Sequence, residues 1–152
     1  MAACVDQCIE GVHFEAGVPA RAAGRKAAAR ALSDLAATAA RPFALLLALS
    51  AERATAERRL HGLIEGVAAC GAEHGARLVG GDLACARGPL ALTVTALGWA
   101  PSEDPPGRDR ARAGQVLVLS GPVGGSLLGR HLRVEPRLAV GQWLHGCGAR
   151  AM

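Results

Sequence analysis

The chain has 152 residues, of which 51% are hydrophobic and 3% aromatic, and it contains no tyrosine. This length suffices for one domain with a core, or for one domain and part of another, and the hydrophobic content argues against disorder. The net charge of +4 permits attraction to phosphates. Basic residues without interleaved aromatic residues argue against a nucleic-acid-binding module.

The five cysteines are scattered and form no CxxC pair, which argues against a zinc site and favours reduced, buried thiols. The longest purely apolar run, residues 43–49, is far too short to span a membrane, and no signal peptide precedes the first motif. We therefore expect a cytoplasmic protein without a membrane partner.

The first predicted elements are the end of a strand over residues 2–5 and a helix over about 20–40, which is rich in strong helix formers. Pro42 ends this helix, because proline disfavours the helical conformation in the residue before it. Residues 42–49 then have the composition of a short, fully buried strand.

Residues 52–73 form the clearest predicted helix, with apolar residues spaced i, i+3, i+4 and i+7. These residues are Leu60, Leu63, Ile64 and Val67. Residues 77–83 are typical of a strand that runs into a glycine loop. Residues 90–98 alternate between apolar and threonine side chains, which indicates a half-buried strand.

The polar, proline-containing stretch 101–114 is predicted to be a linker or long loop. A second buried strand is expected over 116–119, a loop over 120–125, a short helix over 125–133 and a last helix over 137–146. The order β-α-β-α-β-β, a linker and then β-α indicates an α+β domain followed by the opening of a second domain.

Three aspartates stand at positions that small-molecule sites use. Asp6 follows a predicted strand, Asp34 lies inside an alanine- and leucine-rich helix, and Asp82 follows two glycines. Clustered carboxylates beside a glycine-rich backbone suit Mg²⁺–nucleotide chemistry. A structural interpretation is also open: a nearby arginine would satisfy Asp34, and Asp82 is a normal turn residue.

His13 and Glu10 by themselves are more often structural than functional, and residues 120–125 can be a plain loop rather than a phosphate-binding one. The order of all these features along the chain is more informative than any single one. It resembles the order in the thiamine-monophosphate kinase family. The motifs that carry the resemblance are Asp6-x-x-x-Glu10-Gly11-Val12-His13-Phe14, Gly24-Arg25-Lys26-Ala27, Leu32-Ser33-Asp34-Leu35-Ala36-Ala37, Gly80-Gly81-Asp82 and Ser120-Gly121-x-x-Gly124-Gly125-Ser126.

The resemblance implies that the γ-phosphoryl group of ATP is transferred to thiamine monophosphate, giving thiamine diphosphate and ADP. The acceptor is already an anionic oxygen, so no general base is implied, and Mg²⁺ ions neutralise the phosphates. The implied site residues are, for the metal, Asp6, Asp34 and Asp82; for the thiamine moiety, His13; and for the nucleotide, Gly81, Asp82 and Arg108.

The implied fold is α+β. Residues 1–107 would form an AIR synthase-like N-terminal domain, a mixed sheet with helices on one face that dimerises into a barrel. Residues 108–152 would begin an α/β C-terminal domain. The chain departs from the family at several positions. Ala31 replaces an asparagine, Leu83 replaces a threonine, and Thr38-Ala39-Ala40 replaces Met-Gly-Ala.

The family also has a Gly-Asp-Asp segment before the Asp6 motif and an Asp-x-Ser-Asp-Gly motif after a pair like Ala151-Met152, and neither is in this sequence. We therefore expect a fragment of a homodimeric kinase, with the apolar side chains of 116–119 and 127–128 exposed. The alternatives are a non-catalytic dimerisation or ligand-binding domain, and a sister activity such as aminoimidazole ribonucleotide synthetase.

Overall fold

The computed structural model of the chain describes residues 1–100 and 105–152. Its strands and α-helices, in chain order, are β1 (Ala2–Ile9), α1 (Ala20–Ala37), β2 (Arg41–Ala51), α2 (Glu57–Glu73), β3 (Arg77–Cys85), β4 (Ala91–Trp99) and α3 (Leu138–Gly146). Single 3-10 turns lie at Arg108–Arg110, Ser126–Leu128 and Arg130–Leu132. The predicted order β-α-β-α-β-β is therefore confirmed through residue 99.

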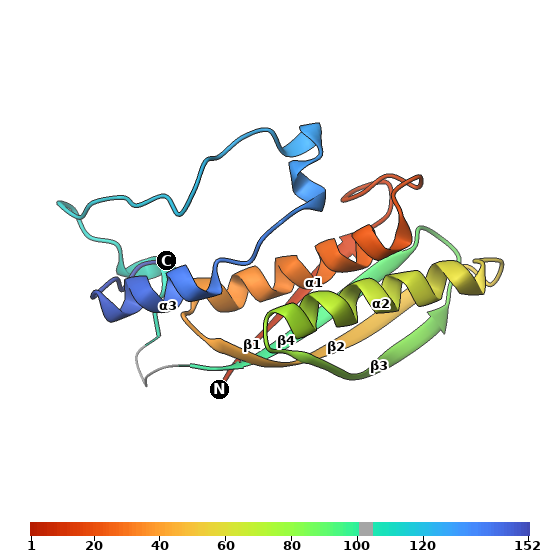
Figure 1. The fold of residues 1–152 in the computed structure, drawn as a ribbon, viewed down its shortest axis with the longest axis horizontal. Coiled ribbons are helices and arrows are strands. Elements are labelled where there is room, and N and C mark those ends of the chain that lie inside the picture. Colours follow the sequence, from red (N-terminus) through yellow and green to blue (C-terminus); the bar gives the residue numbers. More distant parts are fainter. Residues whose placement is uncertain (101–104) are drawn as a thin grey trace.

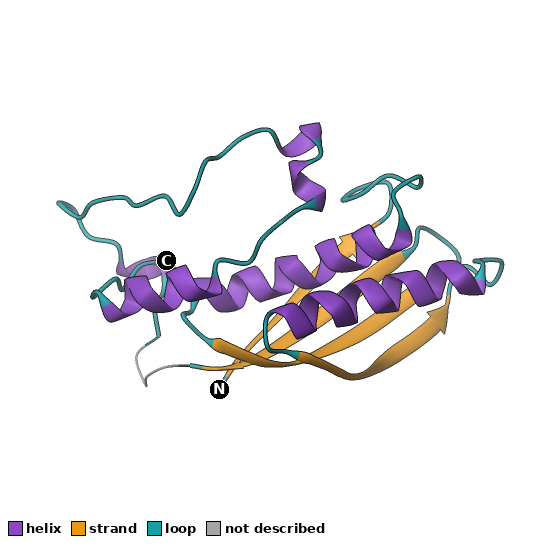
Figure 2. Ribbon diagram, viewed as in Figure 1, coloured by secondary structure: helices purple, strands orange, loops and turns teal. Residues whose placement is uncertain are grey.

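The four strands form one mixed sheet in the order β1-β4-β2-β3 (Figure 1). β4 runs antiparallel to both β1 and β2, and β2 runs parallel to β3. α1 and α2 lie side by side over one face of this sheet (Figure 2). The predicted α+β fold with helices on one face is confirmed, and the sheet is open within one chain.

The core lies between the sheet and the two long helices. Along β4, Leu92, Val94 and Ala96 are fully buried, whereas Thr93 and Thr95 are only partly covered, as their alternation predicts. Each buried residue of this strand therefore faces α1 and α2.

Two glycines allow α1 and α2 to approach one another closely. A Cβ atom at Gly24 would lie 2.1 Å from the carbonyl oxygen of Leu63, and one at Gly66 would lie 2.2 Å from that of Arg21. Any side chain at either position would push the helices apart, because the atoms it meets belong to the backbone.

The structure corrects the predicted glycine loop after residue 79. β3 continues through Gly80 and Gly81 to Cys85 and stays paired with β2. A Cβ atom at Gly81 would lie 1.8 Å from the carbonyl oxygen of Leu47, so the absence of a side chain permits the pairing. β2 itself runs to Ala51, and α2 consequently begins at Glu57 rather than at residue 52.

The predicted buried strand over 116–119 is wrong. These residues form no strand within the described part of the chain, and Leu117 is 98% exposed. A strand needs a partner for its backbone hydrogen bonds, which an apolar run alone does not supply. The expected exposure of the apolar side chains here and at Leu127 and Leu128 is confirmed.

The last part of the chain contains one confirmed and one corrected helix. The helix predicted over 137–146 is α3, which packs against α1 so closely that a Cβ atom at Gly141 would lie 2.1 Å from the Ala36 carbonyl oxygen. The helix predicted over 125–133 is instead two 3-10 turns separated by Gly129. Residues 101–104 of the predicted linker lie outside the described residues, and the domain boundary at 107 stays a prediction.

All five cysteines are free thiols. Cys8 and Cys70 are buried as predicted, whereas Cys85 and Cys147 are exposed, so the prediction of buried thiols is only partly correct. Among the described residues, no helix combines the length and the apolar character needed to cross a membrane.

Candidate functional site

Asp6 lies on β1 and faces α1, where Arg30 binds it with two hydrogen bonds. The Arg30 Nε donates to Oδ2 of Asp6 at 2.8 Å, and a terminal guanidinium nitrogen donates to Oδ1 at 2.9 Å. Both side chains are partly buried. The predicted metal ligand is therefore engaged through both carboxylate oxygens by a cation of the same chain.

Asp34 stands one helical turn after Arg30 on α1 and is exposed. Within residues 1–100 and 105–152 its carboxylate has no hydrogen bond or ion pair. The Cys4 thiol, which donates to the Ala31 carbonyl oxygen at 3.0 Å, lies near both aspartates. The pKa of Cys4 is raised to about 11, mainly by burial, then by the negative charge of Asp34 and, more weakly, by that of Asp6.

These contacts bring two of the three predicted metal ligands to one place. Asp6 from β1 and Asp34 from α1 both act on the Cys4 thiol at the edge of the sheet. The sequence places them 28 residues apart, and the packing of α1 on β1 joins them.

Asp82 lies elsewhere. It is on β3, at the opposite edge of the sheet, where it pairs with Ala48 of β2. Ala48 is exposed on the face that the helices do not cover, so alternation directs Asp82 to that face as well. The two sheet edges are three strand spacings apart, roughly 14 Å. Asp82 therefore does not join Asp6 and Asp34 within one chain.

His13 sits in a tight loop that follows β1. Gly11, with φ 76°, turns the chain, and its N–H donates to the Phe14 carbonyl oxygen at 2.8 Å. Phe14 is buried and anchors the loop in the core. Glu10 forms an ion pair with Arg59 of α2, so its carboxylate fixes the loop from the other side.

Lys26 of α1 also binds this loop, and it was not among the predicted site residues. Its Nζ donates to the carbonyl oxygen of His13 and lies 2.6 Å from Nδ1 of His131. The sequence holds one indication that Lys26 is buried. It is the one lysine of the chain, and Ala23 and Ala29 lie about one helical turn before and after it on the alanine-rich helix. Those alanines mark the buried face.

Arg108 begins a 3-10 turn and lines a cavity of about 640 Å³ between α1, α3 and the extended segment 116–120. Ser33 and Ala36 of α1 and Arg137 line the same cavity. Its walls are mainly apolar, with guanidinium groups among them, a combination that suits a ligand with an apolar ring and an anionic group. The cavity lies beside the helix that carries Asp34.

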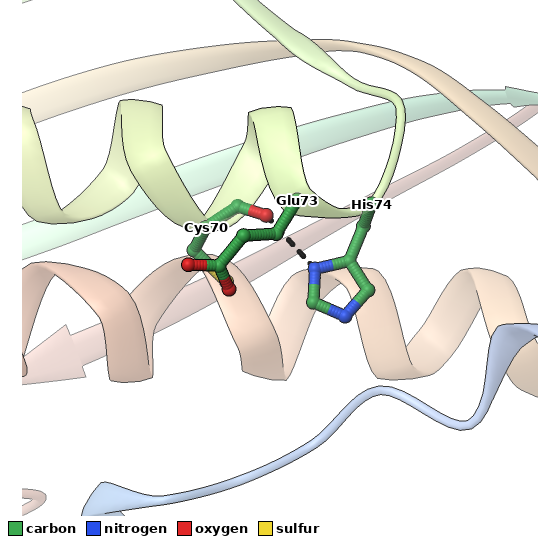
Figure 3. A group of neighbouring side chains, drawn as sticks. All are labelled: Cys70, Glu73 and His74. Atoms are coloured by element: carbon green, nitrogen blue, oxygen red, sulfur yellow. Dashed lines mark hydrogen bonds between the residues drawn. The ribbon is translucent and has the colours of Figure 1, made fainter.

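A second cluster of polar side chains lies at the end of α2. Cys70, Glu73 and His74 lie close together there, and Nδ1 of His74 is 2.8 Å from the Cys70 carbonyl oxygen (Figure 3). Arg25 of α1 lies among them, 3.6 Å from the Cys70 sulfur and 3.4 Å from a Glu73 carboxylate oxygen. Its guanidinium also pairs with Glu135 at 3.0 Å.

This arrangement fits an ion-pair network better than a metal site. Burial raises the pKa of the Cys70 thiol to about 11, so a metal would have to displace both that proton and Arg25. Nε2 of His74 lies 3.1 Å from Glu135, which arrives from the segment before α3. The network thus fastens the last part of the chain to α1 and α2.

Curated relatives match most of the chain. It is 42% identical over 142 residues to the thiamine-monophosphate kinase of Rhodopirellula baltica, a match that covers 91% of this chain and 43% of the relative. It is 40% identical over 137 residues to the thiamine-monophosphate kinase of Synechococcus elongatus, covering 88% of this chain and 41% of the relative. The chain thus spans about two fifths of the length of these relatives.

Solved structures match the fold. The crystal structure of thiamine monophosphate kinase from Aquifex aeolicus superimposes with a TM-score of 0.85 at 25% identity, covering 93% of this chain and 55% of that one. The thiamine-monophosphate kinase of Stenotrophomonas maltophilia gives a TM-score of 0.79 at 32% identity, covering 95% and 53%. The model of the AIR synthase related protein N-terminal domain matches residues 1–100. The chain therefore belongs to the AIR synthase related protein family, and its four-stranded sheet with α1 and α2 is the N-terminal domain of that family.

Proposed function

We propose that the protein containing this chain transfers the γ-phosphoryl group of ATP to thiamine monophosphate. The observation that carries the proposal is the 42% identity to a thiamine-monophosphate kinase over nine tenths of the chain. The arrangement of Asp6, Asp34 and His13 around one helix supports it. Thiamine diphosphate and ADP would be the products, and phosphoryl transfer in the cytoplasm is compatible with five free cysteines.

The chemical task is to bring two phosphate groups together, because the acceptor oxygen is already anionic and needs no strong base. Mg²⁺, when bound, would supply the positive charge that makes this approach possible. Asp34 fits this ion, since Mg²⁺ takes carboxylate oxygens and the Asp34 side chain has no partner in the described part of the chain. Asp6 would bind the ion in place of Arg30, which holds both of its carboxylate oxygens in this structure. We assign both as its ligands.

Asp82 remains a proposed ligand of metal and nucleotide, although within one chain it lies at the other edge of the sheet from Asp6. We also propose a homodimer that pairs the uncovered sheet faces. Gly81, beside it, has a structural reason to be glycine in its contact with Leu47, and a nucleotide contact there would use its backbone. Arg108 is the proposed nucleotide contact at the cavity between α1 and α3.

The test is a coupled assay of ADP release with the longest gene product that contains this chain. Thiamine monophosphate should stimulate ADP release in a Mg²⁺-dependent way, and Asp34→Asn should lower the rate by about a hundredfold or more. Asp109→Asn, on the exposed 3-10 turn, is the matched control. ADP release that depends instead on the substrate of an aminoimidazole ribonucleotide synthetase would identify that sister activity. Folded protein without ADP release with either substrate would favour the non-catalytic domain.

A further inference from the structure

Lys26 is the most buried charged side chain of the described residues, with an exposed fraction of 6%. We propose that Lys26 is a positioning residue for His13: it fixes the main chain of the loop after β1 so that only Nε2 of His13 is left to meet the substrate. This inference rests on the proposed function, because it assigns the free imidazole edge to the thiamine moiety.

The geometry of His13 leaves it a single unengaged polar atom. Its N–H donates to the Ile9 carbonyl oxygen at 2.8 Å. Its Nδ1 accepts a hydrogen bond from the Ile9 N–H at 3.0 Å, which places the proton of the neutral ring on Nε2. Its carbonyl oxygen accepts from Lys26. The described residues offer Nε2 no partner, so this N–H stays available as a donor.

The burial of Lys26 explains why it can act as a rigid support. A buried ammonium is costly unless its N–H groups are bonded. Lys26 has two acceptors, the His13 carbonyl oxygen and Nδ1 of His131, and no carboxylate in the described chain pairs with it. Its pKa is lowered mainly by burial. Moving the loop away would leave the ammonium buried with fewer acceptors.

His131 extends this support to a second part of the chain. It lies in the 3-10 turn Arg130–Leu132, more than a hundred residues after Lys26, and Nδ1 at 2.6 Å from Nζ must accept the hydrogen bond. Lys26 therefore joins the loop of the thiamine contact to the segment that leads into α3. A positioning residue at this junction affects how well the substrate is held and does not touch the phosphates.

The decisive variant is Lys26→Met in the longest gene product that contains the chain, with Arg58→Met, on the exposed surface of α2, as control. Loss of the support should raise KM for thiamine monophosphate about tenfold and leave kcat and KM for ATP within about twofold. In the His13→Ala background, Lys26→Met should have no further effect on KM. An equal effect in both backgrounds, a fall in kcat alone, or a rise in KM for ATP would overturn the proposal.

A second measurement separates this proposal from the proposed function. The imidazole nitrogens of His13, observed by ¹⁵N NMR, should report the Nε2–H tautomer in the wild-type protein and a mixture of tautomers in Lys26→Met. Lys26→Gln, which keeps an N–H donor, should retain the wild-type tautomer, and a mixture of tautomers in this variant would contradict the proposal even if the methionine variant does not fold. If thiamine monophosphate is not phosphorylated but the tautomer responds as expected, the proposed function fails and the positioning role stands. The wild-type tautomer in folded Lys26→Met would refute the positioning role.

Discussion

Arg30 of α1 binds both carboxylate oxygens of Asp6 on β1, at 2.8 and 2.9 Å. The same helix carries Lys26 one turn earlier and Asp34 one turn later. Residues spaced by four lie along one side of a helix, so these three side chains form a single stripe. The stripe meets, in order, the loop of His13, the carboxylate of Asp6 and the solvent. One helix face thus organises most of the candidate site.

The Asp6–Arg30 pair leads to a prediction about divalent cations. Since the guanidinium occupies the two oxygens that a metal would use, Arg30→Gln should strengthen Mn²⁺ binding about tenfold, measured by electron paramagnetic resonance of the free ion. Arg21→Gln is the control, because Arg21 is exposed and pairs with Glu65 on α2 at 3.8 Å. Unchanged or weaker Mn²⁺ binding in Arg30→Gln would mean that Asp6 is a structural partner of Arg30 and not a ligand.

The close approach of α1 and α2 leads to a prediction about stability. Gly66→Ala would place a methyl group 2.2 Å from the Arg21 carbonyl oxygen, so the helices must separate. We expect the free energy of unfolding to fall by about 2 kcal/mol, measured by urea denaturation. Gly146→Ala, at the end of α3 with no atom within 4 Å of the new Cβ, should change it little. An unchanged free energy of unfolding in Gly66→Ala would show that the helices are free to shift.

The sequence predicted the elements of the sheet well wherever the pattern depended on one face being buried. The alternation around Leu92 and Val94 is an example, because the same pleat decides both exposure and pairing. It failed for residues 116–119, where the pattern was right for a strand but the described residues supply no neighbouring strand to pair with them. It also failed at Gly80 and Gly81, because glycine is common in loops and also permits a close pairing of strands.

The candidate site was only partly predictable for a similar reason. The motif order predicts Asp6 and Asp34 as site residues, whereas their placement near one thiol depends on how α1 lies on β1. Asp82 belonged to the same predicted ligand set and lies at the other edge of the sheet. The role of Lys26 was missed because a lysine in an arginine-rich helix looks like one more solvated charge. Contacts across more than a hundred residues, such as Lys26 with His131, have no local signature.

The uncovered face of the sheet leads to a prediction about assembly. Thr95 lies at its centre, paired with Val5 on one side and Leu46 on the other, and Val5 is 63% exposed. If two copies pair through this face, Thr95→Arg should convert a dimer into a monomer in sedimentation experiments, because two buried cations would face each other. Ala54→Arg, on an exposed turn, should leave the dimer intact. A wild-type monomer at all concentrations would contradict the pairing.

Ala39 leads to a prediction about a departure from the family pattern. It occupies the position of the family's glycine and has φ 53°, a left-handed conformation that costs a residue with a Cβ atom about 1 kcal/mol or more. Ala39→Gly should therefore raise the free energy of unfolding by about 0.5–1 kcal/mol, although it removes a buried methyl group. Ala37→Gly, in the last turn of α1, should lower it by up to about 1 kcal/mol. Destabilisation by both substitutions would show that burial of the Ala39 methyl group outweighs the backbone strain.

The ion-pair network at the end of α2 leads to a prediction about pH. Burial by itself would raise the pKa of Glu135, but hydrogen bonds from His74 and Arg25 outweigh it, and the pKa lies below the ordinary value of 4.5. A carboxyl group whose pKa is lowered by folding binds its proton more readily in the unfolded chain. Its contribution to stability is therefore present above pH 4.5 and is lost as the pH falls through the lowered value.

Comparison of the wild-type chain with Glu135→Gln tests this directly. The difference in unfolding free energy should be largest near neutral pH and should close as the pH falls through the lowered pKa of Glu135. Because the Glu135 side chain is half exposed, salt should reduce the difference as well. Glu52→Gln, on the turn before α2, should show no such pH dependence. A difference that persists unchanged at acid pH would mean that Glu135 contributes through packing and not through its charge, and that His74 and Arg25 do not hold the segment before α3 electrostatically.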